Sequence, residues 1–138
     1  MVQLGVSVAV ILIAWIVLNI IADWFIFKKA KKPGWHCLIP FLNTYDEYDI
    51  CWSGNMGILY TLLMFGSYCI PSDNNSTMLT FAASVLGIAL LVIHMIQSIK
   101  LAACFGKGRL YGVFLFCFGG IARIILGLGD AEYIGRVE

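Results

Sequence analysis

Four long apolar stretches, separated by short polar segments, run along the chain. They cover residues 5–27, 54–70, 78–99 and 110–128. As a helix, the first would extend roughly 34 Å at about 1.5 Å per residue, enough to cross a hydrocarbon core of about 30 Å. The second is short, and the fourth is interrupted by Gly119, Gly120 and Arg123. The pattern predicts an all-α membrane protein whose single domain, residues 1–138, is a four-helix transmembrane bundle.

The polar segment between the first two stretches, residues 33–52, predicts helical structure at the membrane surface. Ile39 before Pro40 ends a first short helix, because a residue before proline is kept out of the α conformation. Thr44 and Glu47 then have the spacing of a capping box, which predicts a short amphipathic helix over residues 45–52. The residues expected to form this interfacial motif are Pro33, Gly34, Trp35, Pro40 and Asn43.

Composition supports a membrane environment. The chain is 61% hydrophobic and 12% charged, whereas soluble domains average about 25% charged residues. A chain of 138 residues has too little interior to bury that apolar excess, so the lipid bilayer is its first expected partner. These values exclude a soluble enzyme and a disordered chain, and a net charge of +1 excludes a nucleic-acid partner.

The distribution of lysine and arginine predicts the orientation. Four lysines follow the first apolar stretch and further basic residues follow the third, so the positive-inside rule places both segments in the cytoplasm. The N-terminus and residues 71–77 then lie outside. The position of the tail depends on the fourth stretch. It is outside if residues 110–128 cross the bilayer, and inside if Gly119-Gly120 breaks them into a re-entrant hairpin.

Polar residues inside the apolar stretches are the candidate functional groups, because each is costly in a membrane. Asp23 either reaches the headgroups or a lysine, or acts as a proton- or cation-coupled carboxylate. Arg123 either extends to the surface, or in a re-entrant hairpin meets Asp23 or Asp130, or binds an anionic substrate. The candidate intramembrane residues are Asn19, Asp23, His94, Gln97 and Arg123.

A second group of charges lies in the segment between the first two stretches. Asp46, Glu47 and Asp49 are close in sequence to the four lysines at residues 28–32. They either balance charge locally at the headgroups or form a docking surface for a partner.

Several short motifs occur in a fixed order: K-K-P-G-W from Lys31, L-I-P-F-L-N-T-Y from Leu38, K-L-A-A-C-F-G-K-G from Lys100 and I-L-G-L-G-D-A-E-Y from Ile125. In this the chain resembles a bacterial membrane domain of unknown function that is found alone and also fused ahead of signal peptidase I. The resemblance implies a bacterial cell-membrane location and an association with the secretory or envelope machinery. It implies no catalytic residues.

Two functions are compatible with these patterns. The first is a non-enzymatic accessory or scaffold subunit that binds a protein partner, or a second copy, through its helix faces and residues 28–52. The alternative is a small oligomeric transporter or channel that uses Asp23, His94 or Arg123. The five cysteines lack the spacing of a zinc site or a disulfide framework, and we expect no metal, cofactor or catalytic residue.

Overall fold

The computed structural model describes residues 2–70 and 76–136, and within these ranges the chain forms helices and no strands. The prediction of an all-α fold is confirmed. The elements are α1 (Val2–Lys29), the 3-10 helix η1 (Gly34–Leu38), α2 (Pro40–Cys51), α3 (Gly54–Cys69), α4 (Thr77–Cys104), α5 (Arg109–Cys117) and α6 (Gly119–Leu128). Residues 71–75 of the predicted outer loop lie outside the described part.

Two helices are long and apolar enough to cross a membrane, Gly5–Lys29 within α1 and Thr77–Cys104, which is α4. Almost none of the most apolar part of α1, and none of that part of α4, is buried within the molecule. The predicted second span forms α3, whose 16 residues extend only about 24 Å. The predicted four-span bundle is therefore not confirmed. Among the described helices, two are by themselves long and apolar enough to cross a membrane.

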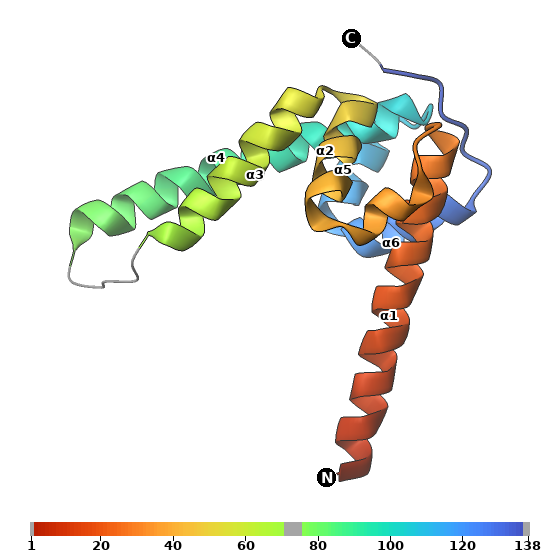
Figure 1. Ribbon diagram of the computed structural model, residues 1–138, viewed down its shortest axis with the longest axis horizontal. Coiled ribbons are helices and arrows are strands. Elements are labelled where there is room, and N and C mark those ends of the chain that lie inside the picture. Colours follow the sequence, from red (N-terminus) through yellow and green to blue (C-terminus); the bar gives the residue numbers. More distant parts are fainter. Residues whose placement is uncertain (1, 71–75, 137–138) are drawn as a thin grey trace.

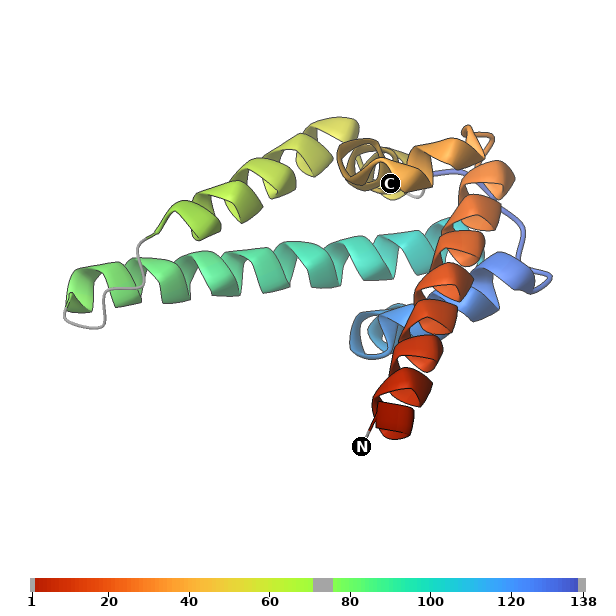
Figure 2. The same ribbon diagram turned by 60° about the horizontal axis from the view of Figure 1, so that its bottom comes forward.

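The helices diverge from a common head (Figures 1 and 2). The C-terminal ends of α1 and α4 meet there, together with η1, α2 and the C-terminal tail, whereas α1 leaves in one direction and the α3–α4 pair in another. The main cluster of buried hydrophobic residues lies in the head and where α5 and α6 contact it: Ile26, Phe27, Ala30, Cys37, Ile50, Cys51, Leu101, Ala102, Cys104, Phe105, Leu115, Ala122, Leu126 and Ala131. The molecule is thus a packed head that carries two apolar arms.

The fourth predicted span is not one helix. It breaks at Phe118 into α5 and α6, so of the two alternatives for residues 110–128 the helix is the one interrupted near Gly119-Gly120. Contacts of α5 with α4 pair Gly112 with Ile99 and Phe116 with His94, so α5 runs antiparallel to α4 and away from the head. The break lies directly before Gly119-Gly120, where the sequence indicated one.

The next helix, α6, returns to the head alongside α1. Gly120 contacts Trp15 and Gly127 contacts Ala22, so the two helices run parallel. The ten residues of α6 extend about 15 Å, half of a hydrocarbon core of about 30 Å. The pair α5–α6 is therefore a helical hairpin that leaves the head and comes back to it, in the angle between α1 and α4 (Figure 2).

Two contacts attach α6 of this hairpin to α1. A Cβ atom on Gly127 would lie 2.5 Å from the backbone oxygen of Ala22, so glycine permits direct backbone contact between α6 and α1. At the end of α6, Lys29 Nζ donates hydrogen bonds to the carbonyl oxygens of Leu126 at 2.9 Å and Gly129 at 2.6 Å. These oxygens have no partner within the helix, and the lysine supplies one.

The segment at residues 33–52 is helical, but the predicted capping box is wrong. Ile39 has an extended conformation and α2 begins at Pro40, one turn earlier than expected. Thr44 lies inside the helix, where its Oγ1 donates to the carbonyl oxygen of Pro40 at 3.1 Å. Proline needs no backbone N–H partner at the first helical position, and this preference outweighs the threonine cap.

Candidate functional site

An ion-pair network joins four helices at the base of the hairpin. Arg123 on α6 lies between Asp23 on α1 and Glu47 on α2: its Nη1 is 3.3 Å from Asp23 Oδ1, and its Nη2 contacts Glu47 Oε1 directly. Gln97 on α4 donates from Nε2 to the same oxygen of Glu47 at 2.7 Å. The side chains of Asp23, Glu47 and Arg123 are 15%, 13% and 20% exposed. We call these four residues the Arg123 network.

The Arg123 network contains three of the five predicted intramembrane residues. Asn19 is instead bonded within α1, because its Nδ2 donates to the carbonyl oxygen of Trp15 at 2.9 Å. His94 lies between two aromatic rings, with centroid distances of 6.4 Å to Tyr60 and 5.7 Å to Phe116. The pairing of Arg123 with Asp23 is the one that the re-entrant alternative predicted.

The sequence pattern around Glu47 does not predict its place in this network. The spacing from Thr44 indicates a helix cap, and the position between Asp46 and Asp49 indicates a surface charge. Successive residues of a helix point about 100° apart, so neighbouring carboxylates can face different surroundings. The available signal was Arg123 itself, because an arginine costs about 2.5–3.5 kcal/mol at a membrane centre and therefore needs a carboxylate partner.

A second cluster at the head surface balances the remaining acids of α2. Lys32 Nζ lies 2.7 Å from Asp49 Oδ2 and 3.3 Å from Asp46 Oδ1, and His36 Nδ1 contacts Asp46 Oδ2. Arg136 in the tail bonds Asp49 Oδ1 at 2.6 Å. Local charge balance thus holds for Asp46 and Asp49.

The charges of this surface cluster shift two pKa values. Burial disfavours the ionised form of Asp49, but the hydrogen bond and charge of Lys32 outweigh it and hold the pKa of Asp49 below its ordinary value. The hydrogen bond from Lys32 to Asp49 in turn raises the pKa of Lys32. Both groups are therefore charged across the neutral range.

The tail closes over the head. Tyr133 donates from its hydroxyl to the carbonyl oxygen of Ile50 at 2.7 Å, and the N–H of Ile134 donates to the carbonyl oxygen of Cys104 at 2.8 Å. With Arg136 on Asp49, these contacts place the tail at the end of the molecule where α1 and α4 end.

The interfacial motif has mixed roles. Pro33 precedes η1, and Gly34 packs so closely on the indole of Trp24 that a Cβ atom would lie 2.7 Å from Cε2. Trp35 is 50% exposed, as an interfacial residue would be. Asn43 lies inside α2 rather than at a helix end, and its Oδ1 is buried without a hydrogen-bond partner in the described part of the chain.

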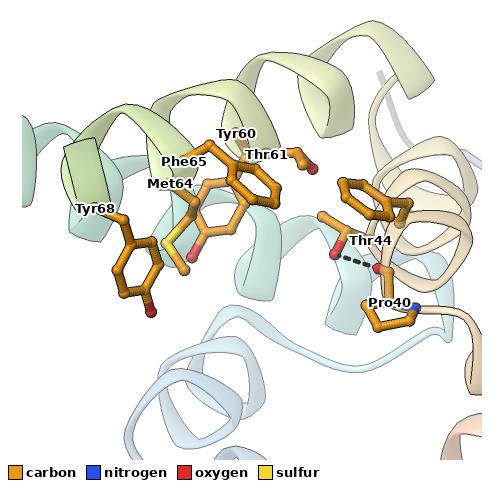
Figure 3. Close-up of a pocket in the computed structure, with 8 residues that line it drawn as sticks. Pro40, Thr44, Tyr60, Thr61, Met64, Phe65 and Tyr68 are labelled. Carbon is orange, nitrogen blue, oxygen red and sulfur yellow. Dashed lines mark hydrogen bonds between the residues drawn. The ribbon is translucent and has the colours of Figure 1, made fainter.

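A groove lined mostly by apolar side chains lies between α2 and α3 (Figure 3). Its volume is about 380 Å³, and Phe41 stacks on Phe65 at its wall with a centroid distance of 5.6 Å. The lining residues are Pro40, Phe41, Thr44, Tyr60, Thr61, Met64, Phe65 and Tyr68. They include no carboxylate, histidine or cysteine, so the groove suits an apolar group rather than bond-making chemistry.

No group of three or more histidine, cysteine, aspartate or glutamate side chains is placed to hold a metal ion within residues 2–70 and 76–136. The site is thus defined by ion pairs and helix contacts. The fold therefore defines the class of the protein. It is an all-helical protein that has two apolar arms and a charged network beside a helical hairpin.

Comparison with known protein families identifies the family of the chain. Residues 35–136 match DUF5684, a family of unknown function, and the protein belongs to this family. No curated protein matches the chain, and no solved structure matches it. The matched range includes α2 to α6 and therefore three of the four residues of the Arg123 network.

Proposed function

We propose that the protein is an integral protein of the bacterial cell membrane with three spans and a re-entrant hairpin. In this topology α1 and α4 cross the bilayer, and α3 crosses beside α4, because it connects the head to the far end of α4. The bilayer adapts to the shorter α3 by local thinning or by helix tilt. The hairpin α5–α6 enters from the cytoplasmic side and returns to it. The exposed apolar surfaces of α1 and α4 support this proposal.

The topology places the N-terminus outside and the tail inside. Lys28, Lys29, Lys31 and Lys32 flank the head, and basic residues near a span favour the cytoplasm. The tail contacts the head through Tyr133, Ile134 and Arg136, so it lies on the same side.

Within this topology, the function that the geometry supports best is that of a non-enzymatic accessory or scaffold subunit. The observation that carries it is the divergence of α1 from the α3–α4 pair, which leaves the apolar sides of both arms without cover from the rest of the chain (Figure 1). A partner's transmembrane helix or a second copy fits between such arms. The Arg123 network, whose charged groups bond one another, then serves to fix the angle of the arms.

Purification from the native membrane in mild detergent tests this function. We expect a stoichiometric partner or a dimer that is lost when the exposed residues of η1 and α2, Trp35, Leu38 and Phe41, are replaced by alanine. The matched control is Leu110→Ala, an exposed apolar residue on α5 that leaves this segment unchanged. A monomer without any partner under these conditions contradicts the scaffold function.

A small oligomeric transporter or channel is the second candidate. The observation that favours it is the broken pair α5–α6 with charged residues beside it, since discontinuous helices frequently surround substrate sites in transporters. In that case Asp23→Asn or Arg123→Gln abolishes a measurable flux in vesicles while the protein still inserts. Flux that is unchanged in both variants removes this candidate.

A further inference from the structure

The Arg123 network holds one more negative than positive charge when Asp23, Glu47 and Arg123 are all ionised. Asp23 and Glu47 each contribute one negative charge, and Arg123 contributes a single positive charge. All three side chains are at most 20% exposed, and the neighbouring Gln97 is 1% exposed. An uncompensated charge away from water is costly, and a buried group commonly avoids that cost by taking up a proton.

The two carboxylates are not equivalent. Glu47 Oε1 accepts from Gln97 and makes the closer of the two contacts with Arg123. Asp23 has one contact within the described part of the chain, at 3.3 Å to Arg123 Nη1. Hydrogen-bond donors stabilise an ionised carboxylate, and Asp23 has fewer of them than Glu47, so Asp23 is the better suited of the two to bind a proton.

We propose that Asp23 is a proton-binding site whose occupancy is governed by the Arg123–Glu47 pair. A proton from water bonds to a carboxylate oxygen of Asp23, which brings the net charge of the network from −1 to zero. Arg123 keeps its positive charge throughout, because a guanidinium does not release a proton in proteins. The inference concerns the isolated chain and does not depend on the partner proposed above.

The surroundings of the two acids fit this assignment. The titratable groups that face Asp23 are Arg123 from α6, Glu47 from α2 and Cys37 from η1. Those that face Glu47 are Arg123, Asp23, His94 from α4, Tyr60 from α3, and Tyr48 and Cys51 on its own helix. Among these described neighbours, Arg123 is the one group with a fixed positive charge.

The site lies close to the end of α1 that carries lysines. Asp23 lies five residues before Lys28, about 8 Å along the helix from the basic end of α1. Its side chain is 15% exposed, so the carboxyl group is not fully enclosed by the molecule. Binding of the proton weakens the attachment of α6 to α1 and leaves Arg123 held by Glu47 on α2. The site therefore couples pH to the contact between the hairpin and the first arm.

Infrared spectroscopy of the full chain in lipid nanodiscs tests the site, with the proton as the only ligand added. We expect a protonated carboxyl band at neutral pH that disappears in alkali. The band moves when aspartate, but not glutamate, carries a ¹³C carboxyl label. Asp23→Asn removes the band. Asp130→Asn, at an exposed aspartate in the tail, leaves it unchanged.

Glu47→Gln is the second variant. It keeps the proposal testable if Asp23→Asn does not fold. It removes the excess charge, so Asp23 then ionises beside Arg123 and the band is lost at neutral pH although Asp23 is present. Absence of the band in the parent protein at neutral pH overturns the proposal. So does a band that moves with labelled glutamate, or a sodium-dependent gain in stability without a band, which would indicate a bound cation instead.

Discussion

Arg123 is the residue on which the head depends. It is the charged residue in the middle of an apolar stretch, and its two terminal nitrogens contact carboxylates from two other helices. These contacts offset the cost of placing a charged group among apolar ones. Removal of Arg123 leaves the buried Glu47 carboxylate, and Asp23 beside it, without a cation.

We therefore expect Arg123→Gln to lower the free energy of unfolding by about 3 kcal/mol, the typical cost of removing one partner from a buried ion pair. Denaturant unfolding in detergent micelles measures it. The control is Arg109→Gln, an exposed arginine at the start of α5, for which we expect a change under about 0.5 kcal/mol. Equal effects of the two substitutions would contradict the structural role of Arg123.

Asp49 makes the stability of the head depend on pH. Because its folded pKa is below the unfolded value of about 3.9, its contribution is complete above that pH and is lost as the pH falls through the folded value. The raised pKa of Lys32 extends the contribution upward, since it is lost only when the pH rises through the folded lysine value.

Asp49→Asn should then cost about 0.5–1 kcal/mol at neutral pH, because both partners are partly exposed. The difference from the parent protein should vanish in acid, below the folded pKa of Asp49. Thermal unfolding across the acidic range measures both. Glu132→Gln, at an exposed acid of the tail, is the control. A difference between Asp49→Asn and the parent that stays constant into strong acid would show that the ion pair is not its cause.

At the scale of elements, the seating of α6 on α1 decides the path of the chain. Gly127 lets the two backbones touch, and Lys29 bonds the last carbonyl oxygens of α6. Neither contact is available to a helix that continues α5 across the bilayer, because both lie at the end of α1 that belongs to the head.

Gly127→Ala tests that seating. Its Cβ atom would lie 2.5 Å from the backbone oxygen of Ala22, so α6 must move and we expect a loss of about 1–3 kcal/mol, typical of overpacking. The matched control is Gly119→Ala on the same helix, whose Cβ atom would have no neighbour within 4 Å. Unfolding in micelles gives both values, and a neutral Gly127→Ala would rule out the close contact.

At the scale of the whole molecule, the arrangement of the head and its two arms leads to a testable membrane topology. If the hairpin returns to the head, a reporter fused after the tail lies in the cytoplasm, on the same side as the segment from Lys28 to Trp52. Reporters at the N-terminus and at Ser76 lie outside. Fusions to an enzyme that is active on one side of the membrane only give the measurement. Activity that places the tail outside would require residues 110–128 to span the bilayer.

The sequence by itself determined the helical class, the two long apolar helices and the residues that require partners. Runs of apolar side chains longer than a bilayer is thick leave few alternatives to a helix. Arg123, which stands inside an apolar stretch, likewise predicts an ion pair. The sequence also indicated the break before Gly119 as one of two alternatives for residues 110–128, because glycine pairs weaken helices.

Only the tertiary structure showed that α6 lies against α1 and which carboxylates Arg123 contacts. Hydropathy carries no information on which helices meet, so it did not reveal that the fourth stretch is divided into α5 and α6. Glu47 looked like a helix cap because its local sequence fits one, whereas its side chain is used by Arg123, 76 residues away. Contacts between distant segments depend on backbone approach, as at Gly127 and Ala22, and that is a property of the folded chain.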